Sequence, residues 1–159
     1  MNPLSCCYIS NLNVQEKKDN TVLMRNIANM TQKLFDSGYL RICVGYGNLL
    51  ERMVALFTAF TTEQNPMVEL LLVPTKLGDP QFNSQADLNR YRYTLARAYQ
   101  TNWMLQNDCR SDFLDYHYDL LKKHSCCVCS LDWNKAETKR ILEFAEYKKM
   151  KLIHFDPDQ

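Results

Sequence analysis

Glycine is scarce in this chain: only four of the 159 residues are glycine. So few glycines leave little room for a glycine-rich loop of the kind that wraps phosphate groups. No apolar run approaches the length of about 18 residues that a membrane-spanning helix needs, so no membrane span is expected. Residues 1–10 have no basic start and only a short apolar stretch, so no secretory signal is expected.

Charge of neither sign is in excess. The chain has 19 basic and 18 acidic residues, a net charge of +1. Such a chain has no strong field to attract nucleic acid or anionic lipid, so neither nucleic acid nor a membrane is an expected partner. Apolar residues make up 46% and charged residues 23%, which favours a folded chain over a disordered one. The length predicts a single domain over residues 1–159.

Cysteine, in contrast, is abundant, and its number is odd. The chain has seven, six of them inside apolar runs. Without a secretory signal, they predict buried thiols in a reducing, cytoplasmic compartment. Cys126 and Cys129 form a C-x-x-C pair, but residues three apart on a strand point to opposite faces and do not converge on one metal. We therefore expect core thiols, and neither a metal nor a cofactor.

Five short apolar runs predict β-strands. They are continuous rather than alternating, which is typical of strands covered on both faces in a parallel sheet. Helical periodicity separates them, and Gly38 stands where the first helix should stop. The predicted strands are Leu4–Ile9, Leu40–Val44, Val68–Val73, Ser125–Leu131 and Lys151–Phe155.

The order of these patterns is β-α-β-α-β-α-α-β-α-β. It predicts an α/β fold, a doubly wound Rossmann-like domain with a five-stranded, mostly parallel sheet. The long connection after the third strand, with apolar stripes around Leu88–Ala98 and Phe113–Leu121, would cross to the other side of strand one. This gives strand order 3-2-1-4-5. Ligands of such sheets bind beyond the carboxyl ends of the strands, at the point where the order reverses.

Two segments at that edge carry candidate residues. Gly45-Tyr46-Gly47-Asn48 joins the second strand to a helix, and its glycines would let the backbone approach a phosphate. The alternative is a plain turn with a capping box, in which Asn48 and Glu51 bond the first turn of the helix. The two interpretations are compatible.

The second segment follows the fourth strand. Asp132 could accept hydrogen bonds from a ribose, Trp133 could stack on a base, and Lys135 and Thr138 could contact an anion at a helix start. Alternatively, Trp133 covers the sheet edge and Asp132 makes a turn. The candidate ligand-binding residues are Ser10, Asn11, Gly45, Tyr46, Gly47, Asn48, Asp132, Trp133, Lys135 and Thr138.

Further patterns bear on helix starts and on other functions. Asn134 and Glu137 match a second capping box. The basic and aromatic stretch from Arg90 to Trp103 fits an amphipathic helix better than a grip on single-stranded nucleic acid. Carboxylates at 108–115 could serve as acid and base, but their spacing is weak evidence. A cysteine–histidine pair has no supporting motif.

The C-terminal third, HSCCVCSLDWNKAETKRILEFAEYKKMKLIHFDP, resembles the SLOG superfamily. This Rossmann-like group is named for the DNA-processing protein DprA and the LOG enzymes, and the chain looks closest to its YpsA-like branch. Asp132 stands at the acidic strand end and Thr138 at the threonine, with Glu137 in place of a glycine. The segments CCYISNLN, LFDSGYLRICVGYGNLLE and VELLLVPTKLGDPQFNSQADLNRY fit the first three strands and their turns.

The resemblance implies a site for a nucleotide or nucleotide-derived small molecule. The chain departs from the family at its glycines, since the glycine-rich turn is reduced to Gly45 and Gly47 and the Pro-Gly-Gly-x-Gly-Thr signature is absent. No strong general base is evident, which favours binding over catalysis. Two alternatives stay open: cleavage of N-glycosidic bonds by Glu51, Asp132 or Glu137, and a degenerate fold that forms homo-oligomers through aromatic side chains between Tyr91 and Trp103.

Overall fold

The computed structural model describes residues 4–15, 19–73, 82–99 and 124–158. These residues form five strands and four helices in alternation, apart from the long connection after the third strand. Their bounds are β1 Leu4–Ser10, α1 Thr21–Asp36, β2 Tyr39–Val44, α2 Leu49–Gln64, β3 Glu69–Leu72, α3 Gln85–Arg97, β4 Cys126–Ser130, α5 Ala136–Tyr147 and β5 Lys151–His154.

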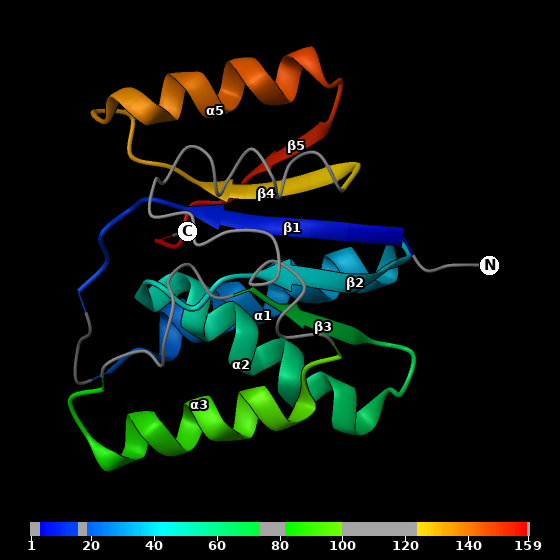
Figure 1. The fold of residues 1–159 in the computed structure, drawn as a ribbon, viewed down its shortest axis with the longest axis vertical. Coiled ribbons are helices and arrows are strands. Elements are labelled where there is room, and N and C mark those ends of the chain that lie inside the picture. Colours follow the sequence, from blue (N-terminus) through cyan, green and yellow to red (C-terminus); the bar gives the residue numbers. More distant parts are fainter. Residues whose placement is uncertain (1–3, 16–18, 74–81, 100–123, 159) are drawn as a thin grey trace.

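The sheet is parallel throughout and has the order β3-β2-β1-β4-β5, which confirms the predicted fold (Figure 1). Every predicted strand exists, with bounds shifted by one residue or less at each end. The reversal of order lies between β1 and β4, as expected. The stripe around Phe113–Leu121, the carboxylates at 108–115, Cys109 and Trp103 lie outside the described residues.

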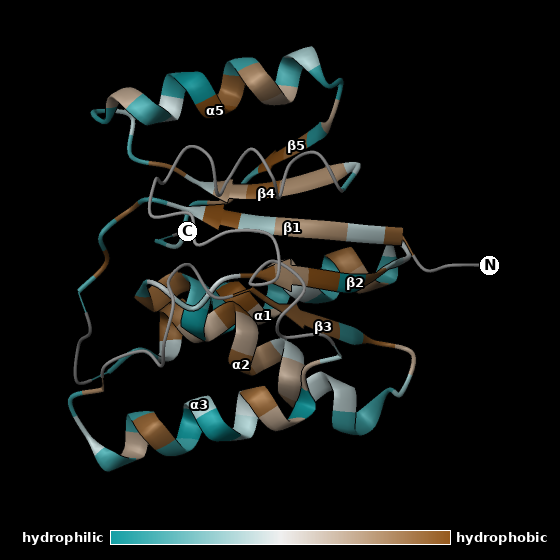
Figure 2. Ribbon diagram, in the orientation of Figure 1, coloured by the Kyte–Doolittle hydropathy of each residue, from teal (hydrophilic) through white to brown (hydrophobic). Residues whose placement is uncertain are grey.

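Helices cover both faces of the sheet. Ile27 of α1 and Val54 of α2 are buried against one face, while Ile141 and Ala145 of α5 are buried against the other. The strands are accordingly mostly apolar, whereas the helices carry polar residues on their outer sides (Figure 2). The continuous apolar runs in the sequence therefore reflect burial on two sides.

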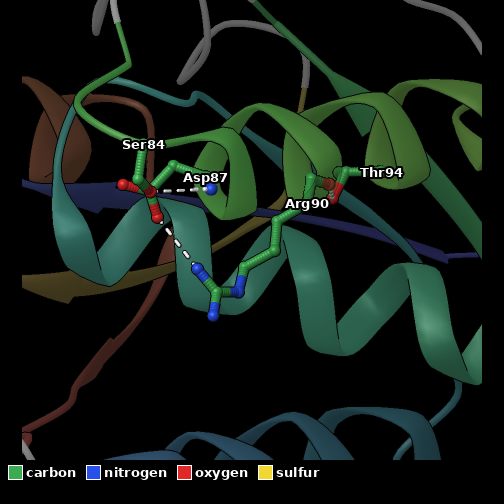
Figure 3. A network of polar contacts seen from close by, with 4 residues as sticks. All are labelled: Ser84, Asp87, Arg90 and Thr94. Atoms are coloured by element: carbon green, nitrogen blue, oxygen red, sulfur yellow. Dashed lines mark hydrogen bonds and ion pairs between the residues drawn. The ribbon is translucent and has the colours of Figure 1, made fainter.

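Helix α3 packs on the outside of α2 (Figure 1). The Ser84 hydroxyl caps it by accepting a hydrogen bond from the backbone N–H of Asp87 at 3.1 Å, and the Asp87 carboxylate pairs with Arg90 at 2.9 Å (Figure 3). The Tyr93 ring lies 4.9 Å from the ring of Phe60 on α2. The part of the stretch up to Arg97 is thus an amphipathic helix, and the Tyr93 ring is turned toward α2. Tyr99, just after the helix, is 61% exposed, and an oligomer interface here stays a prediction.

The six described cysteines are all buried thiols. Cys126 belongs to the core on the α1 side and Cys129 to the core on the α5 side, so the two do point to opposite faces. Within the described residues, no group of three or more histidine, cysteine or acidic side chains is arranged to hold a metal ion. None of the described helices is long and apolar enough to cross a membrane.

Candidate ligand-binding edge

Asn11 joins the carboxyl ends of β1 and β4 to the start of α5. Its side chain accepts a hydrogen bond from the backbone N–H of Asp132 at 2.7 Å and donates one to the Thr138 hydroxyl at 3.0 Å. The ammonium of Lys135 donates to the Asn11 carbonyl at 2.5 Å, and the Thr138 hydroxyl donates to the Asp132 carbonyl at 2.6 Å. We call Asn11, Asp132, Lys135 and Thr138 the Asn11 cluster. Four of the predicted site residues are thus joined to one another by hydrogen bonds.

The turn after β2 forms a second group, tied to β1 through Asn48. The Asn48 side chain accepts a hydrogen bond from the N–H of Glu51 at 3.0 Å and donates one to the Ser10 carbonyl at 2.9 Å. The Glu51 carboxylate in return accepts from the N–H of Gly47 at 3.1 Å. The predicted cap is therefore present. The Glu51 carboxyl accepts a hydrogen bond from an N–H group that a bound phosphate would otherwise use.

Glu51 is also buried, with only 3% of its surface exposed. Burial raises its pKa from 4.5 to about 7, although the N–H groups of Gly47 and Asn48 and the charge of Arg52 act in the opposite direction. This carboxyl group therefore holds a proton up to near-neutral pH.

Tyr46 packs inward instead of facing a ligand. Its ring lies 5.0 Å from the ring of Tyr91 and 6.4 Å from that of Phe82, and it is 7% exposed. The guanidinium of Arg52 lies 5.4 Å from the Tyr46 ring centroid. This side chain anchors the turn to α3. That Tyr46 lines a ligand site stays a prediction.

The loop between β4 and α5 has a different helix start. Helix α5 begins at Ala136 with Lys135 at the capping position, and its first turn has no side-chain cap among the described residues. The predicted capping box of Asn134 and Glu137 is therefore wrong. The reason is the Asp132 carboxylate, which accepts a hydrogen bond from the N–H of Asn134 at 3.0 Å and draws that residue into a turn before the helix.

Trp133 stands out from this loop, with 69% of its surface exposed. Its ring centroid lies 5.8 Å from that of His154, at an interplanar angle of 34°. His154 ends β5 and was not among the predicted ligand residues. The predicted strand order could have indicated His154, because it places the carboxyl ends of β4 and β5 at the same edge of the sheet. Trp133 extends over the sheet edge, and its outer ring surface remains open to solvent.

His154 also approaches a cysteine. Its Nδ1 lies 3.5 Å from the thiol of Cys129. Burial raises the pKa of Cys129 to about 12, with a smaller contribution from Cys7. A thiol that stays protonated is a poor nucleophile, so this pair lacks the thiolate that cysteine catalysis requires.

Comparison of the chain with protein-family models and with curated proteins finds no match. The resemblance to the SLOG superfamily therefore remains a prediction from sequence pattern.

Proposed function

We propose that the chain binds a small nucleotide-like molecule, with an aromatic ring and an anionic group, at the loop between β4 and α5. The observation that carries the proposal is the exposed Trp133 ring, which lies tilted against His154 and three residues before a helix start without a side-chain cap. An exposed aromatic ring supplies a stacking surface for a base. An open helix start supplies N–H groups and positive potential for an anion.

Two further residues fit the same ligand. The Asp132 carboxylate is half-buried at the end of β4, where it can accept hydrogen bonds from a ribose. Lys135 adds a positive charge at the first turn of α5 while bonded to the Asn11 carbonyl. The loop thus offers a ring surface, a hydroxyl acceptor and an anion site within a few residues, the set expected for a nucleotide or an ADP-ribose derivative.

Calorimetric titration of the full chain with adenosine, AMP, ADP and ADP-ribose tests this proposal. We expect AMP to bind more tightly than adenosine, because only AMP carries the anion. Trp133→Ala should weaken binding at least about tenfold, as stacking on one base contributes about 1–3 kcal/mol. Asp132→Ala should weaken the binding of ribose-containing ligands.

The matched control is Tyr147→Ala, which removes an aromatic ring that is 78% exposed at the far end of the same helix. This variant should bind like the wild type. The proposal fails if none of the four ligands binds, or if Trp133→Ala and Asp132→Ala both bind as tightly as Tyr147→Ala.

A second candidate function, cleavage of an N-glycosidic bond, is favoured by one observation. Glu51 is buried and its pKa is raised to about 7, so it can donate a proton at neutral pH. Release of free base from nucleosides and nucleoside monophosphates, followed by chromatography, tests this function. Activity that disappears in Glu51→Gln would support it, and the absence of any base release from the wild type would reject it.

A further inference from the structure

Two rows of side chains cross the sheet at neighbouring register positions and differ in their charge. In the first row, Cys6 of β1 pairs with Cys126 of β4, which pairs with Lys151 of β5. Cys6 and Cys126 both belong to the core on the α1 side. Register partners on parallel strands point to the same face, so a thiol, a thiol and an ammonium group stand side by side.

In the second row, Cys7 pairs with Cys127, and Cys127 pairs with Leu152. Cys7 and Cys127 belong to the core on the α5 side, together with Cys43 of β2. On β5, the first row ends in Lys151 and the second row ends in Leu152. The chain therefore contains two cross-strand thiol pairs on the same two strands, of which only the first has a cationic register partner.

The surroundings of Cys126 favour its thiolate. A thiol–thiol hydrogen bond from Cys6 lowers the pKa of Cys126, and the charge of Lys151 and a hydrogen bond with Tyr39 act in the same direction against the effect of burial. The Lys151 ammonium lies 5.9 Å from the centroid of the Tyr39 ring. In each pair, the thiol–thiol hydrogen bond and burial raise the pKa of one member, Cys6 in the first pair and Cys127 in the second. The second pair differs in having Leu152 where the first has Lys151, so no cationic register partner lowers a pKa there.

Cys126 is a buried residue at the edge of the core. It is the first residue of β4 and directly follows the exposed Ser125. The side chains that flank it are Tyr39, which is half-buried, and Lys151, which is exposed. Cys126 itself is 0% exposed, so an oxidant reaches the sulfur only when neighbouring side chains move.

We propose that Cys6 and Cys126 form a peroxide-sensitive dithiol that closes reversibly to a disulfide between β1 and β4. Adjacent strands place paired Cα atoms about 4.8 Å apart, within the range of about 4.4–6.8 Å that disulfides span. The proposal does not depend on the ligand proposed above.

The reaction balances with hydrogen peroxide as the oxidant. The Cys126 thiolate attacks one peroxide oxygen and the O–O bond breaks, which gives a sulfenic acid on Cys126 and, after proton uptake, one water. The Cys6 sulfur then attacks the Cys126 sulfur, the S–O bond breaks, and a second water leaves with the Cys6 proton. Two thiols lose two electrons in total, and a small thiol reductant restores them by exchange.

The test uses the full chain, reduced, freed of reductant and treated with hydrogen peroxide. Disulfide formation is followed by the loss of two hydrogen masses and by mapping of the linked peptides. Because Cys7 and Cys127 adjoin the proposed pair in sequence, the variants Cys126→Ala and Cys127→Ala assign the bond. We expect the wild type and Cys127→Ala to form a bond between the two peptides, and Cys126→Ala to form none.

A second comparison removes the charge and leaves all thiols in place, for the case in which Cys126→Ala does not fold. Lys151→Met should slow oxidation about two- to fivefold, because less Cys126 is present as thiolate. Lys148→Met, at another exposed lysine, should not change the rate. The proposal is overturned if no disulfide forms, if Cys126→Ala and Cys127→Ala form the same bond, or if the two lysine variants react at the same rate.

Discussion

The starts of α2 and α5 lie on either side of the central strand β1, and they use their backbone N–H groups in opposite ways. At α2, Asn48 and Glu51 bond the first turn, and the Glu51 carboxylate is buried under it. At α5, no side chain among the described residues caps the helix, and Trp133 lies beside it in solvent. The turn with glycines, which resembles a phosphate loop, thus has its helix start bonded by the chain's own side chains. The loop without glycine has a helix start that is free of side-chain caps among the described residues.

This difference shows that glycine content is a poor guide to anion binding when an acidic residue follows three or four positions later. Side chains of the first turn can supply hydrogen-bond acceptors from within the chain, as the Glu51 carboxyl does for the N–H of Gly47. A lysine at the capping position supplies no acceptor, and its positive charge adds to that of the helix start. Substitutions at the start of α2 and at the start of α5 test this comparison.

The largest effect should come from Asn11, which ties β1 to the α5 side. Asn11→Ala leaves the N–H of Asp132 and the buried Thr138 hydroxyl each without one partner. We expect a loss of about 3 to 4 kcal/mol in the free energy of unfolding, measured by urea denaturation. Asn13→Ala, at an exposed position two residues on, should change it by less than about 0.5 kcal/mol. Equal effects of the two substitutions would contradict the role given to the Asn11 cluster.

Next in size is the pH dependence that Glu51 confers. Because its pKa rises from 4.5 in the unfolded chain to about 7 on folding, the folded state holds the proton to higher pH. Its contribution to stability therefore falls as the pH rises from 4.5 to 7, by about 3 kcal/mol in total. Glu51→Gln removes this titration, so the variant should gain stability relative to the wild type between about pH 5 and about pH 8.

The control for this prediction is Glu63→Gln. Glu63 is exposed, and its ion pair with Arg97 lowers its pKa, so it stays charged over the same interval. The stability difference between this variant and the wild type should be constant from about pH 5 to about pH 8. A constant difference for Glu51→Gln as well would show that Glu51 does not titrate there.

A smaller difference in unfolding free energy is expected between the loss of the α2 cap and the loss of the α3 cap. Asn48→Ala loses both the cap of α2 and the bond to the Ser10 carbonyl, whereas Ser84→Ala loses only the cap of α3. We expect about 2 kcal/mol for Asn48→Ala and about 1 kcal/mol for Ser84→Ala, measured by thermal or urea unfolding. If the two values agree, the bond between the turn and β1 contributes nothing.

The smallest effect on stability is expected at Trp133, in the loop before α5. Trp133→Ala removes a ring that is mostly exposed, so the free energy of unfolding should change by less than about 0.5 kcal/mol. A loss of several kcal/mol, seen in the same urea experiment, would show that Trp133 serves packing and would weaken the proposed stacking role.

The sequence predicted the sheet well because burial on both faces leaves a direct trace in it. Continuous runs such as residues 68–73 mark parallel strands, and the long connection after them sets the strand order. The Asn48 cap was predictable because its bond is local. At the start of α5 two local patterns competed, a capping box at Asn134 and a turn made by Asp132, and the structure has the turn. The inward position of Tyr46 depends on rings from α3, which periodicity alone does not place.

The central position of β1 has a consequence for synthesis of the protein. This strand is made before the other strands of the sheet, yet it pairs with β4, which follows more than 100 residues later, as in the pairing of Cys7 with Cys127. The N–H and C=O groups along one edge of β1 therefore stay unpaired until β4 has been made. Such long-range pairing folds slowly and exposes a nascent chain to aggregation. Production in cells should accordingly depend on chaperones and improve at low temperature.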